Sequence, residues 1–232
     1  MIKTHQELAA AIKGKSILHL NSLGKDAVLC LEWLNKFAEP GKIVSLMYKF
    51  DASWPDDEKY LNYLKKRYPK TIFVSEISPL EINDKMTGVF QSPVTLNHIL
   101  NKQDYDEFSL DKLKEDHLVK YGCELFCSGM SCYEGMRRAI MMRKYGLHNE
   151  SRKLIFPIGL MKYKQVIELI KKTGLKIHTS YKFEEGYYDS ASYFKMRSGF
   201  IARPDFKNAV YKQFPLLALD EYRFEVLFNE KK

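Results

Sequence analysis

The sequence predicts an α/β protein, with a parallel five-stranded sheet, helices on both faces, and a small irregular or helical C-terminal subdomain. Short apolar runs, typical of buried strands, alternate with helical patterns between residues 17 and 174. This alternation favours a parallel sheet covered on both faces. The helical pattern after the fifth strand stops at Gly174. Residues 178–204 are aromatic and loop-rich, and two further helical patterns finish the chain. We therefore expect an α/β domain over residues 1–175 and an aromatic-rich subdomain over residues 176–232 that packs on it.

The expected strands and helices follow one another in regular order. The strands are residues 17–20, 42–48, 71–77, 124–127 and 154–156, each a short and mainly apolar run. Apolar residues at helical spacing predict helices near residues 6–12, 28–38, 56–68, 109–120 and 162–172. One more helix is expected from Ser131 to about Tyr145, because Ser131 and Glu134 have the spacing of a capping box.

The composition is that of a folded, basic protein. The 232 residues are 45% hydrophobic and 28% charged, so the chain can bury an ordinary core. The formal charge of +8 favours an anionic partner, a nucleotide or a nucleic acid, but lysines that only confer solubility explain it equally well. No apolar run approaches the roughly 18 residues of a membrane helix. We expect a cytoplasmic protein with no membrane partner; whether it forms a homo-oligomer stays open.

The stretch with the clearest chemical meaning is S-I-L-H-L-N-S-L-G-K-D-A, residues 16–27. It reads as a strand, a tight turn and the start of an apolar helix. The first N–H groups of a helix have no partner within the helix and carry the positive end of its dipole, so this layout can bind an anion. Gly24 lets the backbone approach an oxygen-rich ligand, and Lys25 adds a positive charge.

Within this stretch, S-L-G-K-D-A resembles the PP-loop motif, S-G-G-x-D-S or S-x-G-K-D-S, of the adenine nucleotide alpha-hydrolase-like superfamily. The similarity is greatest to its PAPS reductase-like family. Two positions depart from the motif, because Leu23 replaces a glycine and Ala27 replaces the final hydroxyl residue. The resemblance implies that ATP or a related adenine nucleotide binds to the loop residues Asn21, Ser22, Leu23, Gly24, Lys25, Asp26 and Ala27.

The resemblance extends to the segments after two other strands. Asp51 matches the aspartate of the family pattern D-T-G-x-x-F-P-E-T, where a carboxylate would position ribose or Mg²⁺. The segment from Gly129 to Arg143 is similar to the family pattern G-x-R-R-x-x-S-x-x-R, which contacts the anionic groups of the nucleotide. The resemblance therefore implies nucleotide contacts for Gly129, Arg137, Arg138 and Arg143. A solvated basic helix face is the alternative for the arginines.

Near the C-terminus, S-G-F-I-A-R-P resembles S-G-C-x-x-C-P, in which two cysteines of the relatives bind a metal or cluster. Phe200 and Arg203 occupy the two cysteine positions, so we do not expect that metal site.

Upstream of this segment lies an aromatic run that could stack a nucleobase or form the core of the subdomain. Its members are Tyr181, Phe183, Tyr187, Tyr188, Tyr193 and Phe194. His19, within the first strand, is interpreted as a core histidine with satisfied hydrogen bonds.

Three of the four cysteines, Cys123, Cys127 and Cys132, lie close together in the sequence. The spacing C-x3-C-x4-C fits no common zinc pattern, but three thiolates could hold an iron–sulfur cluster or pass sulfur as a persulfide. For Cys123 and Cys127 the alternative is a small core residue beside a strand. Cys132 is expected in the first turn of a helix, where the dipole lowers the pKa of a thiol, and is the candidate reactive cysteine.

The resemblance implies an ATP pyrophosphatase-type transferase or ligase, often a sulfurtransferase. It would cleave ATP to AMP and pyrophosphate and activate an acceptor for sulfur transfer or for modification of a nucleic acid or nucleoside. The expected catalytic residues are Lys25, Asp26, Asp51 and Cys132. The expected cofactors are ATP and Mg²⁺, with an iron–sulfur cluster as an alternative, and a nucleic acid or a sulfur-donor protein is a candidate partner.

Two other functions stay open. A true PAPS or APS reductase of this family would carry a C-terminal E-C-G-L-H nucleophile, and this chain has no cysteine after Cys132. A non-catalytic nucleotide sensor or nucleic-acid-binding module would explain both Ala27 and the basic charge. A salt-dependent affinity for nucleic acid without AMP formation would distinguish that module from the enzyme.

Overall fold

The computed structural model describes residues 1–49, 56–77, 110–182, 199–213 and 217–229, and the chain divides into two compact units. The first comprises Met1–Tyr48, Lys59–Glu76 and Ser109–Ile177, and the second comprises Lys49–Glu58, Ile77–Phe108 and His178–Lys232. The expected division into an α/β domain over residues 1–175 and a subdomain over residues 176–232 that packs on it stays a prediction.

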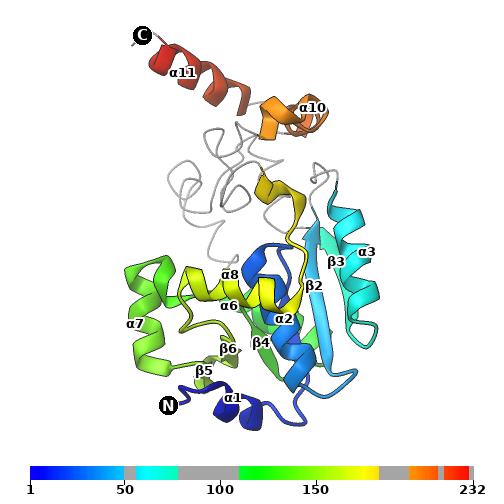
Figure 1. Cartoon of the computed structure of the whole chain (residues 1–232), viewed down its shortest axis with the longest axis vertical. Coiled ribbons are helices and arrows are strands. Elements are labelled where there is room, and N and C mark those ends of the chain that lie inside the picture. The colour runs from blue at the N-terminus through cyan, green and yellow to red at the C-terminus, as the bar shows by residue number, and fades with distance from the viewer. Residues whose placement is uncertain (50–55, 78–109, 183–198, 214–216, 230–232) are drawn as a thin grey trace. The chain divides into compact units, whose positions relative to one another are not determined.

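The first unit contains a six-stranded sheet with the strand order β3-β2-β1-β4-β6-β5 (Figure 1). Strand β1 is parallel to both β2 and β4, and β4 is parallel to β6. Strand β5 is antiparallel to β6 at one edge. The α/β fold class is therefore confirmed, with one more short strand than expected. The bounds are β1 Ile17–Leu20, β2 Ile43–Lys49, β3 Ile72–Ile77, β4 Leu125–Cys127, β5 His148–Asn149 and β6 Leu154–Ile155.

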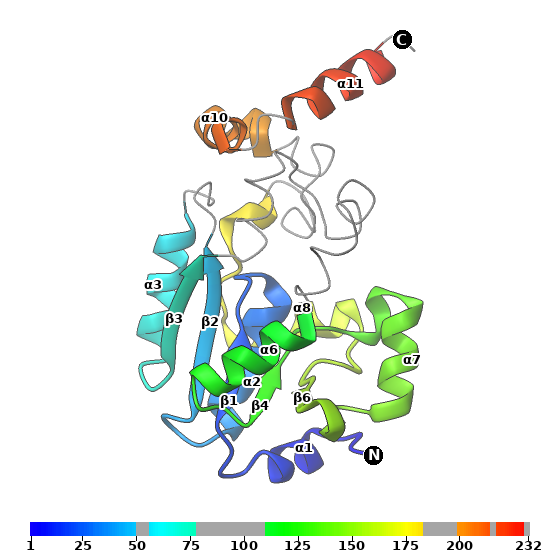
Figure 2. The ribbon, with the colours of Figure 1, turned by 180° about the vertical axis from the view of Figure 1, so that it is seen from behind.

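Alternate residues of the strands pack into two apolar layers, as a pleated sheet requires. On one face, Ile17 and Ile43 join the main core with helices α2 and α8. On the other face, Leu18 and Val44 pack with Leu118 of helix α6. Figures 1 and 2 show these helices on opposite sides of the sheet. The helix bounds are α1 His5–Ala11, α2 Lys25–Phe37, α3 Asp57–Arg67, α6 Leu110–Lys120, α7 Met136–Tyr145 and α8 Tyr163–Thr173.

The expected long helix from Ser131 is not formed. Ser131 and Glu134 do make a capping box, but it caps only the 3₁₀ turn η2, Cys132–Glu134. Gly135 then interrupts the helical backbone, and α7 begins at Met136. A capping box satisfies the N–H groups of one turn, and a glycine directly after that turn disfavours its extension. Cys132 therefore lies in a three-residue turn rather than at the N-terminus of α7.

The described part of the second unit is helical, with η4 Thr179–Lys182, α10 Pro204–Gln213 and α11 Leu217–Asn229. Glu221 of α11 accepts hydrogen bonds from Lys207 and Tyr211 of α10. Phe200 is buried against Tyr211 and Arg203 pairs with Asp205, so the two positions that are cysteines in the relatives have other contacts. Apart from Tyr181, the aromatic run lies outside the described residues.

Among the helices that the structure describes, none combines the length and apolarity needed to cross a membrane.

Candidate functional site

The loop of residues 21–24 joins β1 to α2 at the carboxyl end of β1. The segment after β4 lies against it. A Cβ atom on Gly129 would be only 3.1 Å from both the backbone N of Ala27 and the carbonyl carbon of Asp26. Ligands of parallel α/β sheets bind beyond the carboxyl ends of the strands. The structure therefore brings the predicted loop and Gly129 together where such a ligand would lie.

The loop backbone turns at Leu23, which has a φ of 59°. This left-handed conformation costs a residue with a Cβ about 1–2 kcal/mol, so glycine is the usual occupant. Two contacts stabilise it here. The Leu23 side chain is 5% exposed and belongs to the main core, and the Leu23 N–H donates a 2.9 Å hydrogen bond to Oδ1 of Asn21. The loop thus keeps a glycine-like turn without a glycine at this position.

Helix α2 begins directly after this turn. Its N-cap residue, Gly24, provides no side-chain hydrogen bond to the first turn of the helix. Ser22 is exposed, and its Oγ accepts a long hydrogen bond of 3.4 Å from the Gly24 N–H. A helix start that is not capped by its own side chain suits an anion whose oxygens accept from the first N–H groups.

Lys25 and Asp26 lie side by side in this first turn. The Lys25 Nζ atom is 2.7 Å from Oδ2 of Asp26 and 5.3 Å from the centre of the Tyr163 ring, which opens α8. The Lys25 side chain is only 15% exposed, so the protein holds its charge close to the loop. Ala27, where the family has a hydroxyl, is buried beneath Gly129.

Asn21, expected among the nucleotide contacts, is 1% exposed, and its side chain bonds within the protein. His19 is fully buried, with Nε2 2.9 Å from the Ala27 carbonyl and Nδ1 3.3 Å from Ser45 Oγ. The interpretation of His19 as a satisfied core histidine is confirmed. Burial lowers the pKa of His19 to about 4, so its ring is neutral at physiological pH.

The three arginines expected at the site are not gathered together. Arg137 is exposed at the start of α7, whereas Arg138 forms a 2.5 Å ion pair with Glu134 one turn earlier. Arg143 is exposed near the other end of α7, about 9 Å further along the helix axis than Arg137. Asp51, the remaining expected contact, lies outside the described residues.

The three clustered cysteines fall in three different packing clusters. Cys123 lies before β4 beside Leu118, Cys127 joins the main core, and Cys132 packs near Phe156. Burial raises the pKa of the Cys123 thiol, and it raises that of Cys127 well above its usual value. In the described part of the chain, no three His, Cys, Asp or Glu side chains are grouped so as to hold a metal ion. The structure therefore does not assemble the expected cluster ligands.

The sequence analysis assigned no functional role to two exposed tyrosines, of which Tyr163 lies near the loop. Tyr133 of η2 is 55% exposed, and Lys162 Nζ lies 5.8 Å from its ring centre. Tyr163 is 44% exposed and faces Lys25. Both tyrosines lie near the start of an expected helix. For Tyr163 the available signal was its place between Lys162 and Lys164, whereas no lysine adjoins Tyr133 in the sequence.

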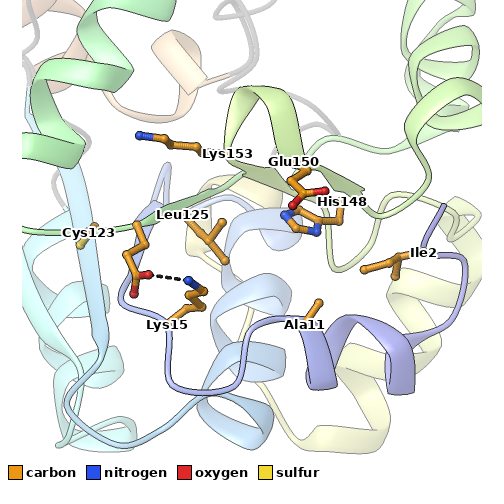
Figure 3. A pocket seen from close by; sticks show the side chains of 9 residues that line it. Ile2, Ala11, Lys15, Cys123, Leu125, His148, Glu150 and Lys153 are labelled. Carbon is orange, nitrogen blue, oxygen red and sulfur yellow. Dashed lines mark hydrogen bonds and ion pairs between the residues drawn. The ribbon is translucent and has the colours of Figure 1, made fainter.

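Figure 3 shows a pocket of about 650 Å³ in another part of the first unit. It lies at the amino ends of β1, β4 and β6. Lys15 and Glu124 form a 2.6 Å ion pair on its wall, with Leu125 and His148 nearby. None of the residues predicted to bind nucleotide lines this pocket, and only Cys123 of the expected residues does. It is thus separate from the loop.

The fold and this site define an α/β protein with an uncapped strand–loop–helix turn at the carboxyl edge of a mostly parallel sheet. No family model and no curated protein matches the chain. Among solved structures, it is similar to the U34-tRNA thiolase NcsA from Methanococcus maripaludis with its 4Fe-4S cluster. The identity is 17% and the TM-score 0.47, over 92% of this chain and 73% of that chain. A likeness of this size says nothing of substrate, cofactor or activity.

Proposed function

We propose that this chain binds ATP, or a related adenine nucleotide, at the loop from Ser22 to Asp26. The observation that carries this proposal is the strand–loop–helix turn, in which an uncapped α2 start and the ammonium of Lys25 lie together. Both features attract phosphate. The resemblance of S-L-G-K-D-A to the PP-loop of PAPS reductase-like proteins supports an adenine nucleotide rather than another anion.

The proposed reaction is transfer of AMP to an acceptor. An acceptor oxygen attacks the α-phosphorus, the bond from that phosphorus to the bridging oxygen breaks, and pyrophosphate leaves with the bonding electron pair. Negative charge then grows on the leaving pyrophosphate. Lys25, close to Asp26 and Tyr163 in the structure, would turn toward these oxygens and neutralise that charge. The enzyme class is accordingly an ATP pyrophosphatase-type transferase or ligase.

Mg²⁺ fits this site through Asp26. Protein-bound Mg²⁺ usually takes one or two carboxylates together with substrate phosphates and water. Asp26 is partly exposed beside the loop and offers one such carboxylate, and Asp51 is the proposed second. Bound metal would draw charge from the phosphates. If the acceptor receives sulfur, Cys132, a partly exposed cysteine after β4, stays the proposed nucleophile as a persulfide loaded by a sulfur-donor protein. The outer sulfur would attack the adenylated carbon and displace AMP, and a thiol reductant would then cleave the remaining S–S bond.

ATP labelled at both the α- and the γ-phosphate, incubated with Mg²⁺ and the protein, tests the reaction when AMP, ADP and pyrophosphate are separated. Without an added acceptor, water takes the acceptor's place at the α-phosphorus. We expect AMP and pyrophosphate in equal amounts, and loss of both with Lys25→Ala. Formation of ADP and phosphate would place the cleavage at another bond and contradict the proposal.

A nucleic-acid-binding module is the second candidate function. It is favoured by two exposed tyrosines that lie next to lysines, Tyr133 beside Lys162 and Tyr163 beside Lys25. Exposed aromatic rings stack bases, and adjacent cations contact phosphates. Binding of a labelled single-stranded oligonucleotide that weakens with salt, with no AMP formed from ATP, would favour this function over the enzyme.

A further inference from the structure

Beneath the loop, four hydrogen bonds join into one buried chain. His19 of β1 and Ser45 of β2 are direct partners in the parallel register. Ser45 Oγ lies 3.3 Å from His19 Nδ1 and 3.1 Å from Asn21 Nδ2. The outer bonds run from the Leu23 N–H to Asn21 Oδ1, at 2.9 Å, and from His19 Nε2 to the Ala27 carbonyl, also at 2.9 Å.

The partners fix the direction of every bond in this chain. The Ala27 carbonyl can only accept, so Nε2 of the neutral His19 ring carries the proton and Nδ1 accepts. The hydroxyl of Ser45 therefore donates to His19 and accepts from the amide of Asn21. Asn21 Oδ1 in turn accepts from Leu23. His19, Asn21 and Ser45 are each at most 1% exposed, so water cannot replace any missing partner.

The two ends of this chain of hydrogen bonds flank the residues that would contact the phosphates. Leu23, at one end, holds the left-handed turn, and Ala27, at the other, lies in the first turn of α2. Gly24, Lys25 and Asp26 lie between them. Because both ends of this segment are connected to the sheet by hydrogen bonds, the N–H groups of these three residues and the Lys25 side chain are held in place.

We propose that His19, Ser45 and Asn21 are positioning residues for the phosphate-binding loop, which they hold ready by fixing Leu23 in its left-handed conformation. The positioning role itself does not depend on the proposed function. Only its expected consequence, tighter ATP binding, rests on that function. A prearranged loop loses less conformational freedom when the nucleotide binds. None of the three side chains touches the nucleotide; they act through Leu23 and Ala27.

The central test is Ser45→Ala, which removes the middle link. We expect ATP affinity to fall about tenfold, the usual effect of losing one net hydrogen bond. Cys30→Ala is the matched control, because it also deletes one buried heavy atom, within α2 but outside the chain of hydrogen bonds. Asn21→Ala should lower ATP affinity by a similar factor, because it removes the acceptor of the Leu23 N–H. Since Ser45 and Asn21 act through the same chain of hydrogen bonds, the double variant should bind ATP about as weakly as either single variant, whereas two independent structural losses would multiply.

A second readout does not depend on ATP. Amide hydrogen exchange of the ligand-free protein should rise in a peptide covering residues 21–29 with Ser45→Ala and stay unchanged there with Cys30→Ala. If exchange rises but even the wild type fails to bind ATP, the proposed function fails and the positioning role stands. Unchanged loop exchange in Ser45→Ala, or affinity losses that multiply in the Ser45→Ala and Asn21→Ala double variant, would overturn the positioning role.

Discussion

Gly129 and Ala27 approach so closely that a methyl group at position 129 would fit only if the backbone moved. A Cβ atom at position 129 would lie 3.1 Å from the Ala27 backbone N. The atoms in its way are backbone atoms of the α2 start, which cannot turn aside as a flexible side chain can. Gly129 is therefore the residue through which the segment after β4 packs against the backbone that follows the loop after β1.

Gly129→Ala should move the start of α2 by a few tenths of an ångström. We expect the free energy of unfolding to fall by about 1–3 kcal/mol, as in other overpacked sites, and ATP affinity to fall as well. Gly122→Ala is a fitting control, because Gly122 lies at the opposite end of β4, has a φ of 60° and has open space around it. It should destabilise the protein by about 1–2 kcal/mol and leave ATP affinity unchanged. Equal loss of affinity in both variants would argue against a local effect.

The two neighbouring arginines of α7 should contribute unequally. Arg138 is engaged with Glu134, whereas Arg137 is exposed. We expect Arg137→Ala to weaken nucleotide binding about three- to tenfold and Arg138→Ala to change it less than twofold. Nucleotide titrations of both variants at low and high salt check this. If neither variant differs from wild type, both arginines belong to a solvated helix face.

Cys132 should be the fastest of the four cysteines to react with iodoacetamide at pH 7. Cys30, Cys123 and Cys127 are buried, whereas Cys132 is partly exposed. Burial also raises the pKa of Cys123 and Cys127, which lowers their thiolate fraction. Peptide mass spectrometry after timed alkylation gives the order of labelling. Labelling of Cys30 at the same rate as Cys132 would remove the reason to consider Cys132 for sulfur chemistry.

The sequence predicted five of the six strands and the loop, because each is a local pattern. Apolar runs mark the strands, and the loop is recognisable from its glycine, lysine and neighbouring helix. Strand β5 could not be found in this way, since His148 and Asn149 are two polar residues whose pairing depends on β6. The start of α7 was misplaced for a related reason. The capping box of Ser131 is local, but whether its turn continues is decided by Gly135.

The buried chain beneath the loop was also beyond sequence reasoning. It depends on His19 and Ser45 facing each other, and that register is set by two strands 26 residues apart. The one signal in the sequence was the presence of a polar residue in each of two otherwise apolar strands. Likewise, Cys123, Cys127 and Cys132 are neighbours in sequence, yet they pack in three different clusters.

The low pKa of His19 predicts a specific dependence of stability on pH. Burial lowers this pKa from 6.5 to about 4, so between these values the unfolded chain binds a proton that the folded protein does not. Stability is therefore fully present above pH 6.5 and declines as the pH falls toward 4. The His19 contribution should amount to about 2 kcal/mol between pH 7.5 and pH 5. Urea unfolding at both pH values should show a loss that is smaller by this amount in His19→Gln. An identical pH dependence in both proteins would contradict the assignment.

The central claim is that the loop from Ser22 to Asp26 binds ATP, and Lys25 is the residue on which it depends most. A charge-assisted phosphate contact contributes about 1.5–3 kcal/mol, which corresponds to roughly 10- to 150-fold in affinity. Lys36, in the last turn of the same helix, provides a control of equal charge at the opposite end. The direct measurement is calorimetric titration of ATP and Mg²⁺ into wild type, Lys25→Ala and Lys36→Ala, with the fold of each checked by circular dichroism. We predict that Lys25→Ala binds at least tenfold more weakly and that Lys36→Ala binds like wild type. Equal ATP affinity of wild type and a folded Lys25→Ala would contradict the account.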